Sequence, residues 1–165
     1  MGCNFLILSI FILGLRWSSC AQDIPQQWAI LTSYEANYTG TNAIIHGLYI
    51  KNHHQLEAGL NYNFSDGFSN NPVIGIGLAY GFEILTNDKW SITSGINYRR
   101  QKPLAIVNIQ ILTYTQGLAY KLNPKLAITS RLGYGVAVER AASAGNFSQN
   151  NNITGSFTLG CVFFL

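Results

Sequence analysis

The chain has 165 residues, of which 48% are hydrophobic and 13% aromatic, a length that suits one domain and a composition that excludes an intrinsically disordered chain. Charged residues make up only 10%, against roughly 25% in ordinary soluble domains, so something other than charge must solvate the surface. The net charge of +3 is small and its cations are scattered, which argues against a nucleic-acid partner because no basic stripe for a phosphate backbone is present.

Residues 1–21 resemble a secretory signal peptide. An apolar run from Phe5 to Leu15 is too short for a membrane-spanning helix, which needs about 20 residues, and the small residues Ser19 and Ala21 precede Gln22. We expect cleavage after Ala21, which leaves residues 22–165 as a single domain. A lipid-modified Cys20 and an uncleaved anchor helix are the alternatives. After cleavage only Cys161 remains, so no disulfide within the chain is expected.

Beyond Gln22 the chain alternates apolar and polar residues in segments of about ten, and no helical period is sustained, so we expect an all-β domain. The alternation predicts eight strands, over Trp28–Tyr38, Ala43–Lys51, His54–Phe64, Val73–Leu85, Lys89–Arg100, Ile106–Leu122, Lys125–Glu139 and Ile153–Leu165. Asn, Gly, Asp and Pro occupy the joints between them, as turns require.

The joints differ in length in an ordered way. Every second joint is tight, at Asn52–His53, Thr86–Asp88 and Asn123–Pro124, whereas Ser65–Pro72 and Arg140–Asn152 are long and predict loops. In an up-and-down barrel alternate joints fall on the same rim, so this pattern predicts one rim of short turns and one of longer loops, as in outer-membrane barrels.

The two faces of the strands decide between a soluble sheet and a membrane barrel. Near Val73 one face carries Ile, Leu, Tyr and Phe, while the other carries mainly Gly and Ala. Glycine destabilises a strand and has no advantage on a water-facing surface, but small residues are needed in the crowded interior of an eight-stranded barrel. We therefore expect the apolar face to meet lipid, with the interior face including Gly47, Gly59, Gly95, Gly117 and Gly160.

Charged residues share the phase of these glycines. We predict a structural polar core in the lumen formed by Glu35, Glu57, Glu83, Arg99, Lys121 and Arg131, with Lys51 and Glu139 in the same phase. Carboxylates and cations that pair can be buried, whereas unpaired ones are costly. The alternative is that these are the water-facing charges of a soluble sandwich.

Aromatic residues fit two membrane interfaces. Outward rings are expected near one rim at Trp28, Phe82, Trp90, Tyr120 and Phe163, and near the other at Tyr38, Tyr62, Phe64 and Tyr98. The strand from Ile106 changes phase between Val107–Ile111 and Leu112–Tyr120, which predicts a β-bulge near Ile111 and Leu112.

The chain ends in the segment Phe157–Leu165, which alternates to its last residue and matches the spacing polar-x-Gly-x-x-apolar-x-apolar at Thr158, Gly160, Phe163 and Leu165. This resembles the C-terminal signal that the bacterial barrel assembly machinery recognises. Together with the signal-like start, the chain resembles the small eight-stranded outer-membrane β-barrel proteins, the OmpX-like and OmpA-N-domain-like group and similar barrels of Bacteroidetes. The resemblance implies a location in the outer membrane of a Gram-negative bacterium, with the lipid bilayer and the assembly machinery as partners.

No catalytic set stands out in the sequence. Lipid A deacylases of the resembled class use a His-x-Ser pair, but His46, His53 and His54 have no Ser two residues on, and the adjacent His53 and His54 lack metal-ligand spacing. We expect no enzyme activity, no cofactor and no metal, and a structural, adhesive or accessory role at a surface assembly. Two alternatives remain open: a soluble, secreted lipocalin-like barrel that binds an apolar ligand, and an outer-membrane lipid-modifying enzyme.

Overall fold

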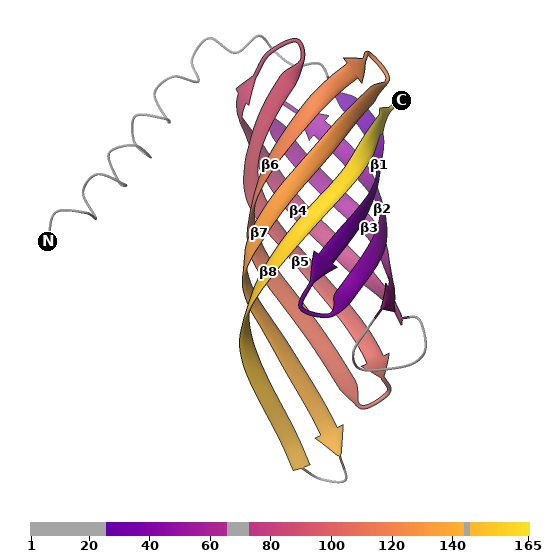
Figure 1. Ribbon diagram of the computed structural model, residues 1–165, viewed down its shortest axis with the longest axis vertical. Coiled ribbons are helices and arrows are strands. Elements are labelled where there is room, and N and C mark those ends of the chain that lie inside the picture. Colours follow the sequence, from indigo (N-terminus) through magenta and orange to yellow (C-terminus); the bar gives the residue numbers. More distant parts are fainter. Residues whose placement is uncertain (1–25, 66–72, 144–145) are drawn as a thin grey trace, which may run out of the picture.

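The computed structural model describes residues 26–65, 73–143 and 146–165, which form one closed antiparallel barrel (Figure 1). Its strands are β1 Gln27–Asn37, β2 Gly40–Lys51, β3 His54–Ser65, β4 Val73–Thr86, β5 Trp90–Leu104, β6 Val107–Asn123, β7 Leu126–Ser143 and β8 Asn146–Phe164. Each strand pairs with its neighbours in sequence, and β8 pairs with β1 to close the barrel. The predicted fold class, an all-β eight-stranded up-and-down barrel, is confirmed. Among the described residues, no helix is long and apolar enough to cross a membrane.

Strands β1–β6 lie within a few residues of the predicted ranges, but the last hairpin does not. The predicted loop Arg140–Asn152 is wrong, because β7 and β8 remain paired as far as Ser143 and Asn146. Residues 148–152 are all polar, so no apolar alternation marked them as a strand. The predicted signal peptide, residues 1–21, lies outside the described residues, and so does the Ser65–Pro72 loop apart from Ser65, the last residue of β3.

The barrel has two unlike rims. The turn rim carries the β2–β3, β4–β5 and β6–β7 connections together with the start of β1 and the end of β8, and the loop rim is the opposite one. At the turn rim Asn52 and His53 both have positive φ, 47° and 68°, as the two central residues of a type I′ hairpin require. In the next turn the Asn87 side-chain oxygen accepts hydrogen bonds from the backbone N–H groups of Lys89 and Trp90.

The outer wall of the barrel is apolar. Large side chains stand out from every strand, and Trp28, Leu78 and Tyr134 are 56%, 51% and 65% exposed. A wall of this composition suits hydrocarbon, where a closed barrel also leaves no backbone group of the wall unpaired. The soluble lipocalin-like alternative requires an apolar cavity, whereas the centre of this lumen is ionic, as described below.

The lumen is not polar throughout, which differs from the expectation that apolar side chains all face lipid. Near the turn rim a buried cluster comprises Ala29, Leu31, Leu48, Ile50, Ala127 and Val162. Near the loop rim Val107, Ile109 and Ile111 pack inside against Ala137. The predicted β-bulge at Ile111 and Leu112 is therefore wrong, because the register with β5 and β7 is continuous there. The phase change in the sequence arises because β6 is apolar on its inner face up to Ile111 and on its outer face from Leu112 onward.

Two residues of β2 that were predicted to face the lumen face outward instead. Gly47 and Lys51 face outward, because Ile44, His46 and Leu48 occupy the buried face. The predicted lumen positions of Gly47 and Lys51 are wrong for a physical reason: β2 carries apolar residues on both faces, so its alternation does not distinguish inside from outside.

Candidate functional site

Two ion pairs cross the lumen between opposite walls. The guanidinium of Arg131 on β7 forms two contacts with the carboxylate of Glu57 on β3, at 2.5 and 2.8 Å. Arg99 on β5 forms an ion pair with Glu35 on β1. In both cases the partners lie four strands apart in an eight-stranded barrel, so each pair spans the lumen. We call these four residues the ionic core.

Further polar groups complete the ionic core. The hydroxyl of Thr158 and the amide of Asn37 donate hydrogen bonds to Glu35 at 2.8 and 2.6 Å, and Nδ1 of His46 lies 3.5 Å from the Glu57 carboxylate. Glu35, Glu57 and Arg99 are buried, so their charges are shielded from water. Such a core is stable only while every charge keeps its partners, because an unpaired buried charge is costly.

Glycines provide the space that these side chains need. A Cβ atom added to Gly77 on β4 would lie 2.6 Å from Nε2 of His46, so the imidazole occupies the space that a side chain there would fill. At Gly117 on β6 an added Cβ would lie 3.1 Å from Cγ of Arg131. The small inward residues are therefore matched to particular large neighbours.

Two residues predicted for the polar core lie away from its centre. Glu83 is buried near the turn rim, where Gln55 donates a hydrogen bond to it at 2.8 Å and His53 lies 3.7 Å away. Lys121 is exposed near the end of β6 and the structure does not bring it into the ionic core. Of the six predicted residues, the structure thus brings Glu35, Glu57, Arg99 and Arg131 together.

The cluster of amide residues at the loop-rim end of the lumen was not predicted from the sequence. Asn42, Asn61 and Asn63 are at most 1% exposed, Gln101 donates to Asn42 at 2.7 Å, and Asn63 donates to the backbone oxygen of Thr39 at 2.8 Å. The alternation of β3 places Asn61 and Asn63 on its inward face. It does not show which residues they meet, because an amide carries no charge for which an opposite charge can be sought in the sequence.

The ionic core is suited to bracing the barrel. Each of its two carboxylates forms an ion pair with an arginine, so the carboxylate oxygens already have strong hydrogen-bond donors. In the described part of the chain no three His, Cys, Asp or Glu side chains gather at a spacing that could hold a metal ion. The geometry thus joins β1 to β5 and β3 to β7 across the lumen.

Comparison with known proteins supports the fold. No family model and no curated protein matches the chain. A solved structure described as a de novo designed transmembrane β-barrel superposes with a TM-score of 0.58 at 12% identity, covering 88% of this chain and 100% of that one. The solution structure of the designed barrel TMB2.3 gives 0.54 at 11% identity, covering 87% and 97%. A KdgM porin solved with disordered oligogalacturonate gives a TM-score of only 0.30 at 12% identity, covering 82% of this chain and 98% of that one.

The chain therefore has the fold of eight-stranded transmembrane β-barrels, and its apolar outer wall agrees with that fold.

Proposed function

We propose that this protein is a non-enzymatic barrel of the outer membrane of a Gram-negative bacterium, and that it binds partners through the β7–β8 hairpin. The ionic core supports a closed barrel over a diffusion pore, because two ion pairs cross the lumen. The apolar wall supports a bilayer location. Binding residues of proteins are found disproportionately on surface segments that a rigid scaffold holds in place, which favours the part of the barrel that projects furthest.

The observation that carries the proposal is an exposed strand edge. β8 pairs with β7 from Asn146 to Phe163, but with β1 only from Phe157 onward. Residues 148–156 thus have no strand on their second edge within the described part of the chain. Within this stretch, the Asn152 side-chain amide donates a 2.9 Å hydrogen bond to the Tyr38 hydroxyl. Figure 1 shows the hairpin projecting well beyond the other strands at the loop rim.

A free edge of this kind favours strand addition. Its unpaired backbone N–H and C=O groups can pair with an extended segment of another chain, and proteins usually block such edges with charge or proline. Ser148, Gln149, Asn150 and Asn151 are uncharged and none is proline, so the edge is unprotected. The proposed partner is an extended polypeptide segment at the cell surface, which gives the barrel an adhesive or accessory role.

Adjacent proline substitutions test this proposal. Successive residues of a strand direct their N–H groups to opposite edges, so Asn150→Pro and Asn151→Pro each remove an N–H from a different edge. One of these two variants lacks an N–H group on the free edge. We expect that variant to reduce the adhesion of cells that express the barrel by about tenfold or more, as loss of a strand-addition site requires. The barrel should keep its heat-modifiable gel mobility in both variants. Equal adhesion by wild type and both variants would rule the edge out.

The membrane location is tested separately. We expect the protein to require detergent for extraction from outer-membrane fractions and to shift in gel mobility on boiling. Release into aqueous buffer as a monomer would contradict a bilayer location. Phospholipid hydrolysis by the purified barrel would overturn the non-enzymatic part of the proposal.

The segment Phe157–Leu165 is the proposed contact with the barrel assembly machinery. In the structure Phe157 and Phe163 face outward near the closing β8–β1 seam. Replacement of Phe163 by Asp should slow assembly in cells while refolding of the purified chain in detergent proceeds. Equal assembly of both proteins in cells would remove this partner from the proposal.

A further inference from the structure

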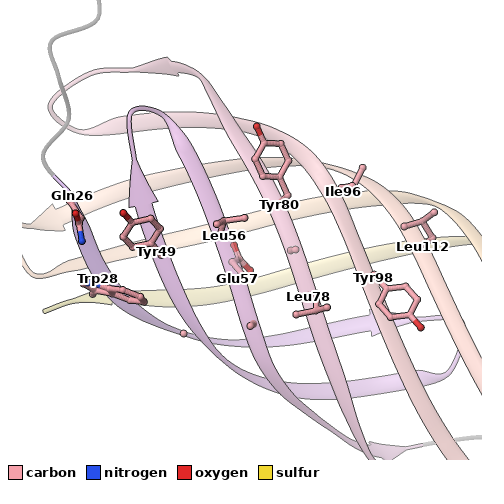
Figure 2. A pocket seen from close by; sticks show the side chains of 13 residues that line it. Gln26, Trp28, Tyr49, Leu56, Glu57, Leu78, Tyr80, Ile96, Tyr98 and Leu112 are labelled. Atoms are coloured by element: carbon pink, nitrogen blue, oxygen red, sulfur yellow. The ribbon is translucent and has the colours of Figure 1, made fainter.

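The outer wall is hollowed on one side by an apolar groove of about 730 Å³. The groove crosses the strands between two rows of outward side chains that contain Trp28 and Leu78, and it extends from β1 to β6. In Figure 2, Gln26, Trp28 and Tyr49 lie toward one end of the groove, and Tyr98 and Leu112 lie toward the other. The first end is at the turn rim and the second is in the middle of the wall.

Two small residues create the hollow. Gly47 on β2 and Ala58 on β3 are register partners that both face outward, and large side chains surround them. Packing within the barrel does not require this glycine, because an added Cβ would meet nothing closer than a backbone oxygen at 3.8 Å. Inward glycines such as Gly77 are different, since a Cβ there would collide with a neighbour.

Glycine in a strand lowers stability, and Gly47 differs from the equally open outward Gly155 in that it lies on the floor of a groove between large side chains. Close approach of an external group to the wall would explain a glycine in this place. Because the groove is lined almost entirely by apolar side chains, that group must itself be apolar.

The turn-rim end of the groove is polar and cationic. Lys51 lies two residues beyond Tyr49 on the outward face of β2, about 7 Å along the strand. It is exposed, and no carboxylate pairs with it in the described residues. The turn rim also carries Lys89 and Lys125, against a single exposed acidic residue, Asp88, in its described part.

We propose that the groove binds one phospholipid of the adjoining leaflet, with an acyl chain over Gly47 and Ala58 and the phosphate at Lys51. Four steps between strands, from Trp28 on β1 to Ile96 on β5, span about 19 Å. With strands tilted by about 40°, a path perpendicular to them descends about 12 Å along the membrane normal, most of the depth of one leaflet, which is about 15 Å. The cationic end and the apolar floor thus match the two parts of an anionic phospholipid. This site lies on the wall of the barrel and is independent of the β7–β8 hairpin.

Native mass spectrometry of the full chain in a mild detergent tests the site. The protein is titrated with phosphatidylglycerol and, for comparison, with phosphatidylcholine. We expect one molecule of phosphatidylglycerol to be retained in preference to phosphatidylcholine. Gly47→Leu and Ala58→Leu fill the groove and should each reduce retention by about tenfold, the effect of displacing roughly two methylene groups from apolar contact. Lys51→Gln should reduce retention of phosphatidylglycerol to that of phosphatidylcholine.

Gly155→Leu is the matched control. Gly155 also faces outward, with its nearest neighbour at 3.7 Å from an added Cβ, but it lies on β8 outside the groove. Its substitution should leave lipid retention unchanged. Equal retention by wild type and both groove variants would overturn the proposal. So would a lipid-free dimer that Gly47→Leu abolishes, since a second copy of the chain would then occupy the groove. Heat-modifiable mobility identifies correctly folded variants before the comparison.

Discussion

The two faces of β4 are built under different physical constraints. Its outward residues, such as Ile76 and Leu78, are large and exposed, whereas Gly75 and Gly77 face inward and are buried. The outer face needs only apolar bulk, because fluid lipid adapts to its shape. The inner face must fit particular partners, because the lumen is closed and its ion pairs connect opposite walls. On the outer face, a substitution should therefore be tolerated if the new side chain is apolar. In the lumen, it should be tolerated only if the new side chain fits the particular partners around it.

The largest effect is expected from breaking the ionic core. Arg131→Met leaves the buried Glu57 carboxylate without its ion-pair partner, and it should lower the free energy of unfolding by about 3–5 kcal/mol. Guanidinium unfolding of the barrel in lipid vesicles measures this change.

A double variant sharpens that result. Adding Glu57→Gln to Arg131→Met removes the stranded charge, so the double variant should recover most of the lost stability. If both variants are equally unstable, the arginine contributes through packing and the ion pair is not what braces the lumen.

Charge on the outer face should have the next largest effect. Leu78→Arg places a cation on the lipid-facing wall and should cost about 2–4 kcal/mol near the bilayer midplane. The measurement is the folded fraction in vesicles, read from heat-modifiable mobility. Normal insertion of this variant would show that the wall of β4 does not face hydrocarbon.

A single methyl group should distinguish the two faces. Gly77→Ala forces the His46 imidazole to move and should cost about 1–3 kcal/mol, the usual range for overpacking. Leu78→Ile, one residue away on the lipid face, should change stability by less than about 0.5 kcal/mol. If Gly77→Ala and Leu78→Ile lower the free energy of unfolding equally, the two faces of β4 do not differ in how closely their side chains are packed.

Apart from the Leu78→Ile control, the smallest effect is expected at the turn rim. His53 adopts a positive φ of 68°, where glycine is less strained, but its imidazole also lies 3.7 Å from Glu83. His53→Gly relieves the backbone strain of the positive φ but loses the contact with Glu83. The two effects should nearly cancel, so the free energy of unfolding should change by no more than about 1 kcal/mol. Thermal unfolding in detergent should show a small shift, and a large loss would assign the contact with Glu83 a greater role.

Sequence alternation by itself determined the eight strands, their antiparallel order, the tight turns and the inward phase of Glu35, Glu57, Arg99 and Arg131. Alternation is a local property: it repeats every two residues and needs no knowledge of distant partners. It was ambiguous where both faces of a strand are apolar, as in β2, and where both are polar, as at 148–152 in β8. It was misleading at the start of β6, where the apolar residues face the lumen and Asn108 and Gln110 face outward.

The tertiary structure alone decided which residues meet. The pairing of Glu35 with Arg99 and of Glu57 with Arg131 depends on the stagger of strands around the closed barrel, which brings together side chains 64 and 74 positions apart. The outward hollow at Gly47 and the free edge of β8 have the same origin. Each arises from register between neighbouring strands, and register is fixed by closure of the whole barrel.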